Sequence, residues 1–296
     1  MASTGVSGFK FDAGEAVFVP NGAMADPNAY CSQWAAFAAR FGGGGEVRCA
    51  AHSQSAGVWT REFDKDSRWS HHNGLRALIT ATLHLGLLGY PFVLPDMVGG
   101  NAYSEEMVDP QGDEAGASET GGDGDAAQGN DGGQSPASPP STLSSLFYGD
   151  LPDQELYMRW CAANALLPAV QFSIAPWQYD DDTAGACRRA LELRREHLPL
   201  LEELAQQALV SGEPIVRPLW WHDPTDATCQ WVDDAFMLGN RTLVAPILEA
   251  GVTSRPVYLP MGRWRDQRRR EHEGPVWIVD HSVGRDDVVA LFELVG

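Results

Sequence analysis

The fold is best predicted from Phe9-Lys10-Phe11-Asp12-Ala13-Gly14-Glu15, a short stretch near the start of the sequence. An alternating apolar run from Val6 ends there in the Asp12 carboxylate, and a glycine follows closely. A strand that ends in this way places its acid at the mouth of a sheet or barrel, where the loops after parallel strands assemble active sites. A solvent-exposed acid at an ordinary strand end explains the same stretch equally well, so other parts of the chain must decide.

Two more strand-like segments lead into acidic stretches. The first runs into Glu62-Phe63-Asp64-Lys65-Asp66, and a later apolar run ends at Pro95-Asp96-Met97-Val98-Gly99-Gly100. Between them, residues 70–88 carry leucine and isoleucine at helical spacing, and residues 89–94 read as a buried strand. This strand–helix–strand order with apolar strands is typical of parallel βα packing.

Length and charge limit the classes of partner. The chain has 296 residues, enough for one large or two ordinary domains with a sizeable core. Its formal net charge of −19 and its pI near 4.6 argue against nucleic acid or an anionic membrane as a partner. The five cysteines are scattered without a Cys-x-x-Cys spacing, which predicts reduced core residues and no zinc site.

No signal peptide or membrane-spanning segment is predicted. The first eight residues lack both a basic region and an apolar region. The most apolar stretch, residues 75–94, is interrupted by His84 and by turn-forming glycine and proline. That stretch is therefore expected to be a helix followed by a buried strand.

The second half of the chain predicts an insertion, more helices and a change of class. Residues 104–142 contain nine Asp or Glu, no Lys or Arg and no periodic apolar face, which predicts a disordered acidic insertion. From Thr242 onward, short apolar runs separated by turns predict a small antiparallel domain. We expect an α/β region over residues 1–240 and a β-domain over residues 241–296. Helical spacing between the insertion and that domain occurs at residues 154–166, 183–195 and 198–210.

Asp12 and Asp64 are 52 positions apart, each at the start of a predicted loop after a strand. Two carboxylates that converge at a barrel mouth suit glycoside hydrolysis, with about 5–5.5 Å between them in retaining enzymes and about 6.5–9.5 Å in inverting ones. The same acids, together with Asp66 and Asp96, could instead bind Mg²⁺ for phosphoryl transfer. No phosphate-binding loop accompanies them, so the sequence favours the first chemistry.

Other polar and aromatic residues have an ordinary structural explanation beside a functional one. His71 and His72 are neighbours on a predicted helix and so do not face the same way to share a metal ion. Trp177, in the turn Pro176-Trp177-Gln178-Tyr179, could stack on a sugar ring or simply pack against the protein.

Ordered motifs along the chain resemble glycoside hydrolase family 31, most closely its myogenesis-regulating glycosidase branch. The motifs are long, specific and in order, and the resemblance covers nearly all of the chain except the insertion and about the last thirty residues. They are Phe9-Lys10-Phe11-Asp12-Ala13-Gly14-Glu15, Asp64-Lys65-Asp66-Ser67-Arg68-Trp69, Gly89-Tyr90-Pro91-Phe92-Val93-Leu94-Pro95-Asp96-Met97-Val98-Gly99-Gly100-Asn101, Glu155-Leu156-Tyr157-Met158-Arg159-Trp160, Gln171-Phe172-Ser173, Gly212-Glu213-Pro214-Ile215-Val216-Arg217-Pro218-Leu219-Trp220-Trp221, Leu243-Val244-Ala245-Pro246-Ile247-Leu248 and Val257-Tyr258-Leu259-Pro260-Met261-Gly262-Arg263-Trp264.

The resemblance implies a retaining α-glycosidase on a (β/α)₈ TIM barrel, acting on an oligosaccharide or another glycoside without a metal or an organic cofactor. By this resemblance, Asp12 is the nucleophile. Asp64 is the acid/base and is preferred over Asp66, because it precedes Trp69 by five residues, as the family's acid/base does. The substrate-binding residues that the resemblance implies are Arg48 and Asp96, to which the turn adds Trp177.

Two departures from the family pattern modify these expectations. Gln171-Phe172-Ser173 stands where typical α-glucosidases of the family have Phe-Arg-x-His, which argues against a simple α-glucoside specificity. Only eleven residues precede Asp12, where family enzymes have a β-sandwich and three barrel strands. We therefore expect the C-terminal part of the barrel, about five strands, followed by the small antiparallel β-domain. The alternative is a non-catalytic fragment or remnant that binds a sugar or a protein.

Overall fold

A four-stranded parallel sheet forms the N-terminal region. The structure, a computed structural model, describes residues 5–102 except 21 and 24, and residues 151–296 except 285 and 286. The four strands pair in chain order and all run parallel, which confirms the predicted βα packing. The insertion expected at residues 104–142 lies outside the described residues. The strands are β1 (Phe9–Phe11), β2 (Gly45–Val47), β3 (Trp59–Arg61) and β4 (Val93–Leu94).

Local sequence signals explain the helices of this region. Helix α1 (Pro27–Ala39) begins at Asp26, whose side chain accepts a hydrogen bond of 2.9 Å from the N–H of Asn28, with proline in the first turn. Helix α2 (Leu75–Leu87) buries leucine, isoleucine and threonine along one face, as the spacing predicts. Two short 3₁₀ helices complete the region: η2 (Ala16–Phe18) and η3 (Gln54–Ala56).

The next segment contains a long helix that the sequence pattern divides in two. After α3 (Gln154–Asn164) and η6 (Pro176–Gln178), helix α4 runs unbroken over Asp181–Ser211, with Pro199 inside it. The two-helix prediction was wrong because the buried face continues past the proline. The side chains on that face are Cys187, Ala190, Leu201, Leu204 and Ala208, at three- and four-residue steps with three whole turns between Ala190 and Leu201.

A six-stranded antiparallel sheet closes the chain, in the order β5-β6-β7-β10-β8-β9. It begins at β5, earlier than the change of pattern at Thr242 suggests, and a short helix, α5 (Leu219–His222), follows β5. The predicted division at residue 240 therefore falls inside this sheet. Its strands are β5 (Val216–Arg217), β6 (Phe236–Leu238), β7 (Thr242–Ala245), β8 (Ser254–Asp266), β9 (Glu271–Ser282) and β10 (Ala290–Leu294).

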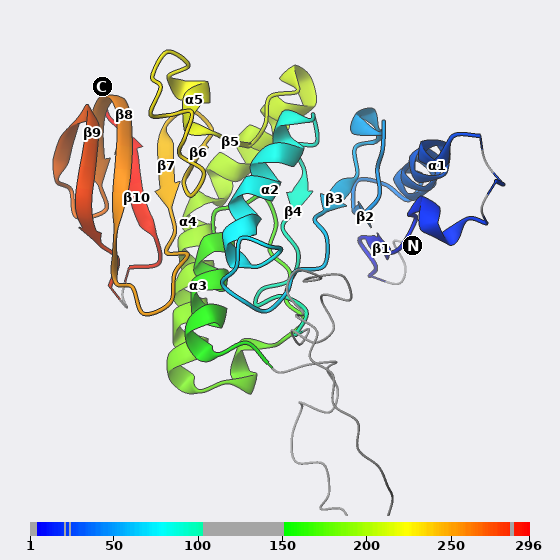
Figure 1. The fold of residues 1–296 in the computed structure, drawn as a ribbon, viewed down its shortest axis with the longest axis horizontal. Helices are drawn as coiled ribbons and strands as arrows, with labels where there is room; N and C mark the ends of the chain where they lie inside the picture. The colour runs from blue at the N-terminus through cyan, green and yellow to red at the C-terminus, as the bar shows by residue number, and fades with distance from the viewer. Residues whose placement is uncertain (1–4, 21, 24, 103–150, 285–286) are drawn as a thin grey trace, which may run out of the picture.

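The main hydrophobic core lies between the two sheets, among α2, α3, α4 and the strands β5 to β7. Figure 1 shows these helices in the middle of the molecule, with the parallel sheet and α1 at one end and β8 to β10 at the other. A smaller core packs α1 on β2 through Ala35, Ala38 and Val47. Among the residues described, no helix combines the length and apolar character that crossing a membrane requires.

Candidate active site

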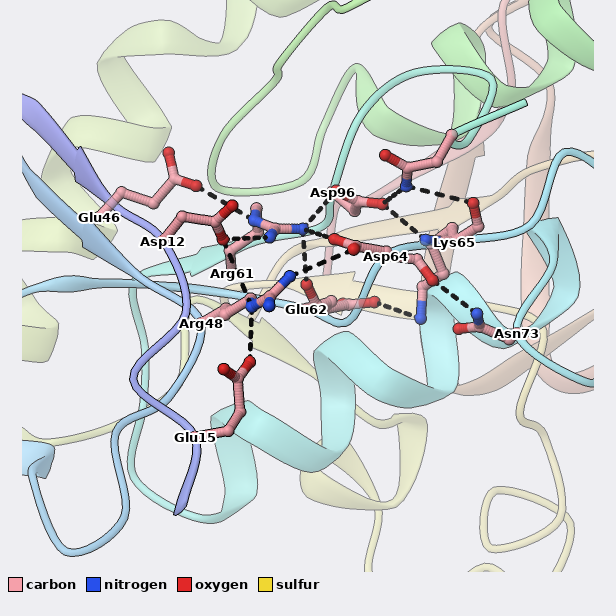
Figure 2. Close-up of polar contacts among 11 residues, drawn as sticks. Asp12, Glu15, Glu46, Arg48, Arg61, Glu62, Asp64, Lys65, Asn73 and Asp96 are labelled. Atoms are coloured by element: carbon pink, nitrogen blue, oxygen red, sulfur yellow. Dashed lines mark hydrogen bonds and ion pairs between the residues drawn. The ribbon is translucent and has the colours of Figure 1, made fainter. Parts of the chain in front are cut away.

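The side chains selected from the sequence gather at one edge of the parallel sheet. Asp12 directly follows β1, Arg48 directly follows β2, Asp64 lies just after β3, and Asp96 just after β4. Because the four strands are parallel, their carboxyl ends meet at the same edge, where barrel enzymes build their active sites. Figure 2 shows the acids around two arginine side chains.

Arg61, the last residue of β3, is the centre of this cluster (Figure 2). Its side chain is 1% exposed, and its Nη1 donates to Asp64 Oδ1 at 2.7 Å and to Asp96 Oδ1 at 2.8 Å. The second terminal nitrogen, Nη2, donates to Asp12 Oδ1 at 3.3 Å. Its Nε forms an ion pair with Glu46 Oε1 at 3.2 Å. One guanidinium therefore contacts four carboxylates from four segments.

Arg48 makes a second bridge between the same two acids. Its Nη1 donates to Asp64 Oδ2 at 3.2 Å, and its Nε forms an ion pair with Asp12 Oδ1 at 3.3 Å. Glu15 Oε1 pairs with the same Nε at 2.5 Å. Asp12 and Asp64 are thus joined through two guanidinium groups, with positive charge between them.

The main chain beside Asp64 is held on both sides. Its carbonyl oxygen accepts a hydrogen bond of 2.6 Å from Asn73 Nδ2. The N–H of Lys65 donates to Asp96 Oδ2 at 2.7 Å, and the carbonyl oxygen of Lys65 accepts from the N–H of Asn101 at 2.8 Å. These bonds fix the direction in which the Asp64 side chain leaves the loop.

Backbone conformation at the site is unusual. Ala13, Asn73 and Asp96 have φ values of 61°, 59° and 65°, in the left-handed region that residues other than glycine rarely adopt. Residues held there cost stability and persist only where surrounding contacts enforce them, which is common at functional sites. Each of the three lies next to a cluster acid, is one, or hydrogen-bonds to one.

The electrostatics favour an ionised Asp12. Burial alone would raise the pKa of Asp12, but the Ala13 N–H and the charges of Arg48, Lys10 and Arg61 outweigh it and lower that pKa. The Asp12 side chain is 57% exposed, so it is accessible from solvent. Glu46 behaves in the opposite way, since burial raises its pKa despite Lys10 and Arg61.

The remaining predicted residues lie in different surroundings. Asp66 is buried and forms an ion pair of 2.5 Å with Arg68. Asp64, in contrast, shares the partners Arg48 and Arg61 with Asp12. Asp96 is 0% exposed and both of its oxygens accept hydrogen bonds from the protein, so its direct contact with a substrate stays a prediction. Trp177 is 80% exposed on η6, and its role also stays a prediction.

Sequence reasoning missed Arg61. A signal for it exists, because strands of a parallel sheet are buried on both faces and a charge placed there needs a partner. Arg61 is such a charge, at the end of Trp59-Thr60-Arg61. Glu46, in the middle of β2, gives the same signal.

The site is not arranged as a metal centre. In the described parts of the chain, no group of three or more His, Cys, Asp or Glu is placed to hold a metal ion. The space between the carboxylates contains the guanidinium groups of Arg48 and Arg61 instead. The magnesium alternative therefore gains no support from this geometry.

Family profiles and curated relatives agree on one family. Residues 48–204 match the glycosyl hydrolases family 31 TIM-barrel domain, and residues 212–292 match the glycosyl hydrolase family 31 C-terminal domain. The myogenesis-regulating glycosidase of Mus musculus is 38% identical over 290 residues, covering 96% of this chain and 36% of that protein. The SITS-binding protein of Tetronarce californica is 30% identical over 267 residues, covering 88% of this chain and 32% of that protein.

Solved structures share the fold over nearly the whole chain. The cycloalternan-degrading enzyme from Trueperella pyogenes superimposes with a TM-score of 0.73 at 22% identity, over 98% of this chain and 38% of that one. A family 31 dextranase from Flavobacterium johnsoniae gives a TM-score of 0.72 at 21% identity, over 99% and 34%. This chain spans about a third of the length of the two curated relatives. The predicted fold class, TIM-barrel elements followed by an antiparallel β-domain, is confirmed, and the chain belongs to glycosyl hydrolase family 31.

Proposed function

We propose that this site hydrolyses α-glycosidic bonds with retention of configuration, with Asp12 as nucleophile and Asp64 as acid/base. The observation that carries the proposal is the meeting of these two carboxylates, from different strands, on the guanidinium groups of Arg48 and Arg61. Retaining glycosidases need two carboxyl groups close together on opposite sides of the scissile bond.

The two acids divide the chemistry. Asp12, with its lowered pKa, is an ionised carboxylate that attacks the anomeric carbon while Asp64 gives its proton to the leaving oxygen. The glycosidic bond breaks and a glycosyl ester of Asp12 forms. Asp64 then takes a proton from water, whose oxygen attacks the anomeric carbon and releases the sugar and the Asp12 carboxylate.

Arg48 is the proposed substrate-binding residue of this arrangement. Its side chain is 19% exposed, so it is accessible to a sugar, and it lies between the two acids. Its N–H groups suit sugar hydroxyls, which accept hydrogen bonds. Trp177 adds an exposed ring on which a sugar could stack, and this part of the proposal depends on its exposure alone.

Turnover of nitrophenyl α-galactoside and α-glucoside tests the proposal. We expect nitrophenol release by the wild-type chain, with the sugar appearing first as the α-anomer by proton NMR, and loss of release in Asp12→Asn and Asp64→Asn. Asp181→Asn, an exposed acid at the start of α4, is the control and should keep full activity. Absence of turnover beyond the level of Asp12→Asn would contradict the proposal and favour a binding module.

Azide separates the two roles. In Asp64→Ala, azide should attack the glycosyl ester and give the α-glycosyl azide, since configuration is retained over two steps. In Asp12→Ala, azide takes the place of the nucleophile and should give the β-glycosyl azide in a single step. The reverse pattern would exchange the two assignments.

A further inference from the structure

We infer that Arg61 and Asp96 form a buried positioning pair, in which Arg61 holds Asp12 and Asp64 at a fixed separation without touching the substrate, and Asp96 anchors Arg61. The inference rests on the proposed function for its catalytic meaning. Its structural content, the coupling of Arg61 to Asp12, can be tested without turnover.

The geometry of Arg61 explains why an arginine stands there. Each guanidinium nitrogen lies within ion-pair distance of a carboxylate: Nη1 of Asp64 and Asp96, Nη2 of Asp12, and Nε of Glu46. Nη1 and Nη2 donate hydrogen bonds, whereas Nε meets Glu46 without hydrogen-bond alignment. A planar fork of five N–H donors can serve several acceptors in fixed directions, whereas a lysine offers one nitrogen on a flexible stem. With its side chain 1% exposed, Arg61 has no surface left for a sugar.

Asp96 anchors the same loop by two routes. Its Oδ1 accepts from Arg61, and its Oδ2 accepts from the main-chain N–H of Lys65 at 2.7 Å and from Asn101 Nδ2 at 2.8 Å. Asp64 is therefore tied to Asp96 through Arg61 at its carboxylate and through Lys65 at its backbone. The strained φ of 65° at Asp96 is consistent with a residue held by these contacts.

Arg48 provides the contrast within the same cluster. It contacts the same two acids but is partly exposed, and it pairs with Glu15 on the opposite side from Arg61 (Figure 2). Arg48 and Arg61 both bridge Asp12 and Asp64, but only Arg48 is accessible to a substrate. Loss of a substrate-binding arginine raises KM, while loss of a positioning arginine lowers kcat.

The decisive experiment is a carbon-13 carboxyl NMR titration of Asp12 in the full chain. We expect Asp12 to titrate at a higher pH in Arg61→Met than in wild type, by up to about one pH unit, the lower end of what a neighbouring arginine does to an Asp. Arg217→Met is the matched control. Arg217, in β5, is also buried, with 2% of it exposed, but its partners are Glu213 and Asn240 and not the acids of the cluster. An unchanged midpoint in folded Arg61→Met would overturn the inference.

If Arg61→Met does not fold, a charge-balanced variant and a measurement on the wild-type chain still test the inference. Arg61→Met/Asp96→Asn removes both members of the buried pair, leaves no charge of that pair unpaired, and should show the same rise for Asp12. In the wild-type chain, the guanidinium nitrogen resonances of Arg61 should shift with the Asp12 midpoint while those of Arg217 do not. Arg61 nitrogen shifts that do not change at the Asp12 midpoint would refute the coupling.

An activity arm distinguishes this inference from the proposed function. If wild type hydrolyses the nitrophenyl substrates, Arg61→Met should lower kcat about a hundredfold with little change in KM, the cost of misplacing a reacting group by about 1 Å. A raised KM at constant kcat would instead show that Arg61 binds substrate. If wild type shows no turnover, the proposed function fails and the NMR titration still decides the positioning pair.

Discussion

Glu62 and Lys65 form an ion pair of 3.1 Å, between Oε2 and Nζ, with both side chains almost completely buried. They stand on either side of the Phe63–Asp64 step, and Thr82 of α2 donates a hydrogen bond of 2.6 Å to Glu62 Oε1. The pair therefore ties the loop that carries Asp64 to helix α2. Burial raises the pKa of Glu62 to about 7, despite the opposing charge of Lys65.

The raised pKa of Glu62 predicts a loss of stability as pH rises. In the folded chain Glu62 keeps its proton up to about pH 7, and it forms the ion pair with Lys65 only once it is ionised above that pH. The unfolded chain loses the same proton near pH 4.3, so this group lowers the unfolding free energy by about 3 kcal/mol across that interval. Glu62→Gln should lack this slope in urea unfolding measured from pH 4 to 8. Glu202→Gln, an exposed position on α4, should keep the wild-type slope. Identical pH dependence in wild type and Glu62→Gln would contradict the prediction.

The ion pair between Arg61 and Asp96 should behave as a coupled unit in stability. Arg61→Met leaves the buried Asp96 carboxylate without its ion pair, so we expect this variant to cost about 3 kcal/mol or more. Asp96→Asn should cost less, because Arg61 keeps its ion pairs with Asp12, Glu46 and Asp64. The double variant should cost less than the sum of the two, by about 1–3 kcal/mol. Urea unfolding of all four proteins measures this coupling, and strict additivity would show that the two residues stabilise the fold independently.

Arg48→Lys should affect substrate binding more than chemistry. Lysine keeps the positive charge near Asp12 and Asp64 but loses the fork that serves Asp12, Glu15 and Asp64 together. We expect KM for the nitrophenyl substrate to rise about tenfold or more, which is about 1.4 kcal/mol of binding, with a smaller change in kcat. Steady-state kinetics of wild type and Arg48→Lys measure both constants, and an unchanged KM would remove Arg48 from the substrate site.

The shared edge of Asp12, Arg48, Asp64 and Asp96 could be predicted, because each follows a strand and parallel strands align their carboxyl ends. The role of Arg61 could not, since its four partners come from four separate segments and only the folded chain brings them together. The burial of Asp96 could not be predicted either, because its partners also come from separate segments. Its acceptors are satisfied by Arg61, Lys65 and Asn101, which the sequence does not connect to it.

Helix α4 shows the limit of local rules in the fold itself. A proline removes one backbone hydrogen bond and usually ends or kinks a helix. In this chain, Pro199 lies inside a continuous helix whose buried face packs against the main core on both sides of it. Tertiary packing therefore outweighs the local preference, and a single sequence does not reveal that contribution.

His281 should make the chain sensitive to acid. It is buried beside Phe292, and both ring nitrogens lack a hydrogen-bond partner among the described residues. Burial lowers its pKa, with Arg268 and Arg270 acting in the same direction and Asp266 and Asp287 opposing them.

Because the unfolded chain takes up a proton near pH 6.5 that folded His281 resists, stability should fall as pH drops below that value. His281→Phe should flatten the fall between pH 7.5 and 5.5 in urea unfolding. The exposed His71→Phe should leave it unchanged. An equal acid loss in His281→Phe would assign the sensitivity to other groups.

Gly14 should be required for its size as well as for its backbone, because it lies under the Trp34 ring beside Asp12. Its φ is 95°, and an added Cβ would stand 2.3 Å from Trp34 Cδ1. Trp34 cannot move freely, since its Nε1 donates to the Phe11 carbonyl oxygen at 3.3 Å.

Gly42 is a matched control, with a φ of 96° and nothing within 4 Å of an added Cβ. Gly42→Ala should cost about 1–2 kcal/mol for the backbone conformation alone. Gly14→Ala should add about 1–3 kcal/mol of overpacking and lower kcat by displacing Asp12. Equal losses of stability in the two variants would mean that Trp34 moves aside at little cost, so that Gly14 serves the turn and does not position the nucleophile.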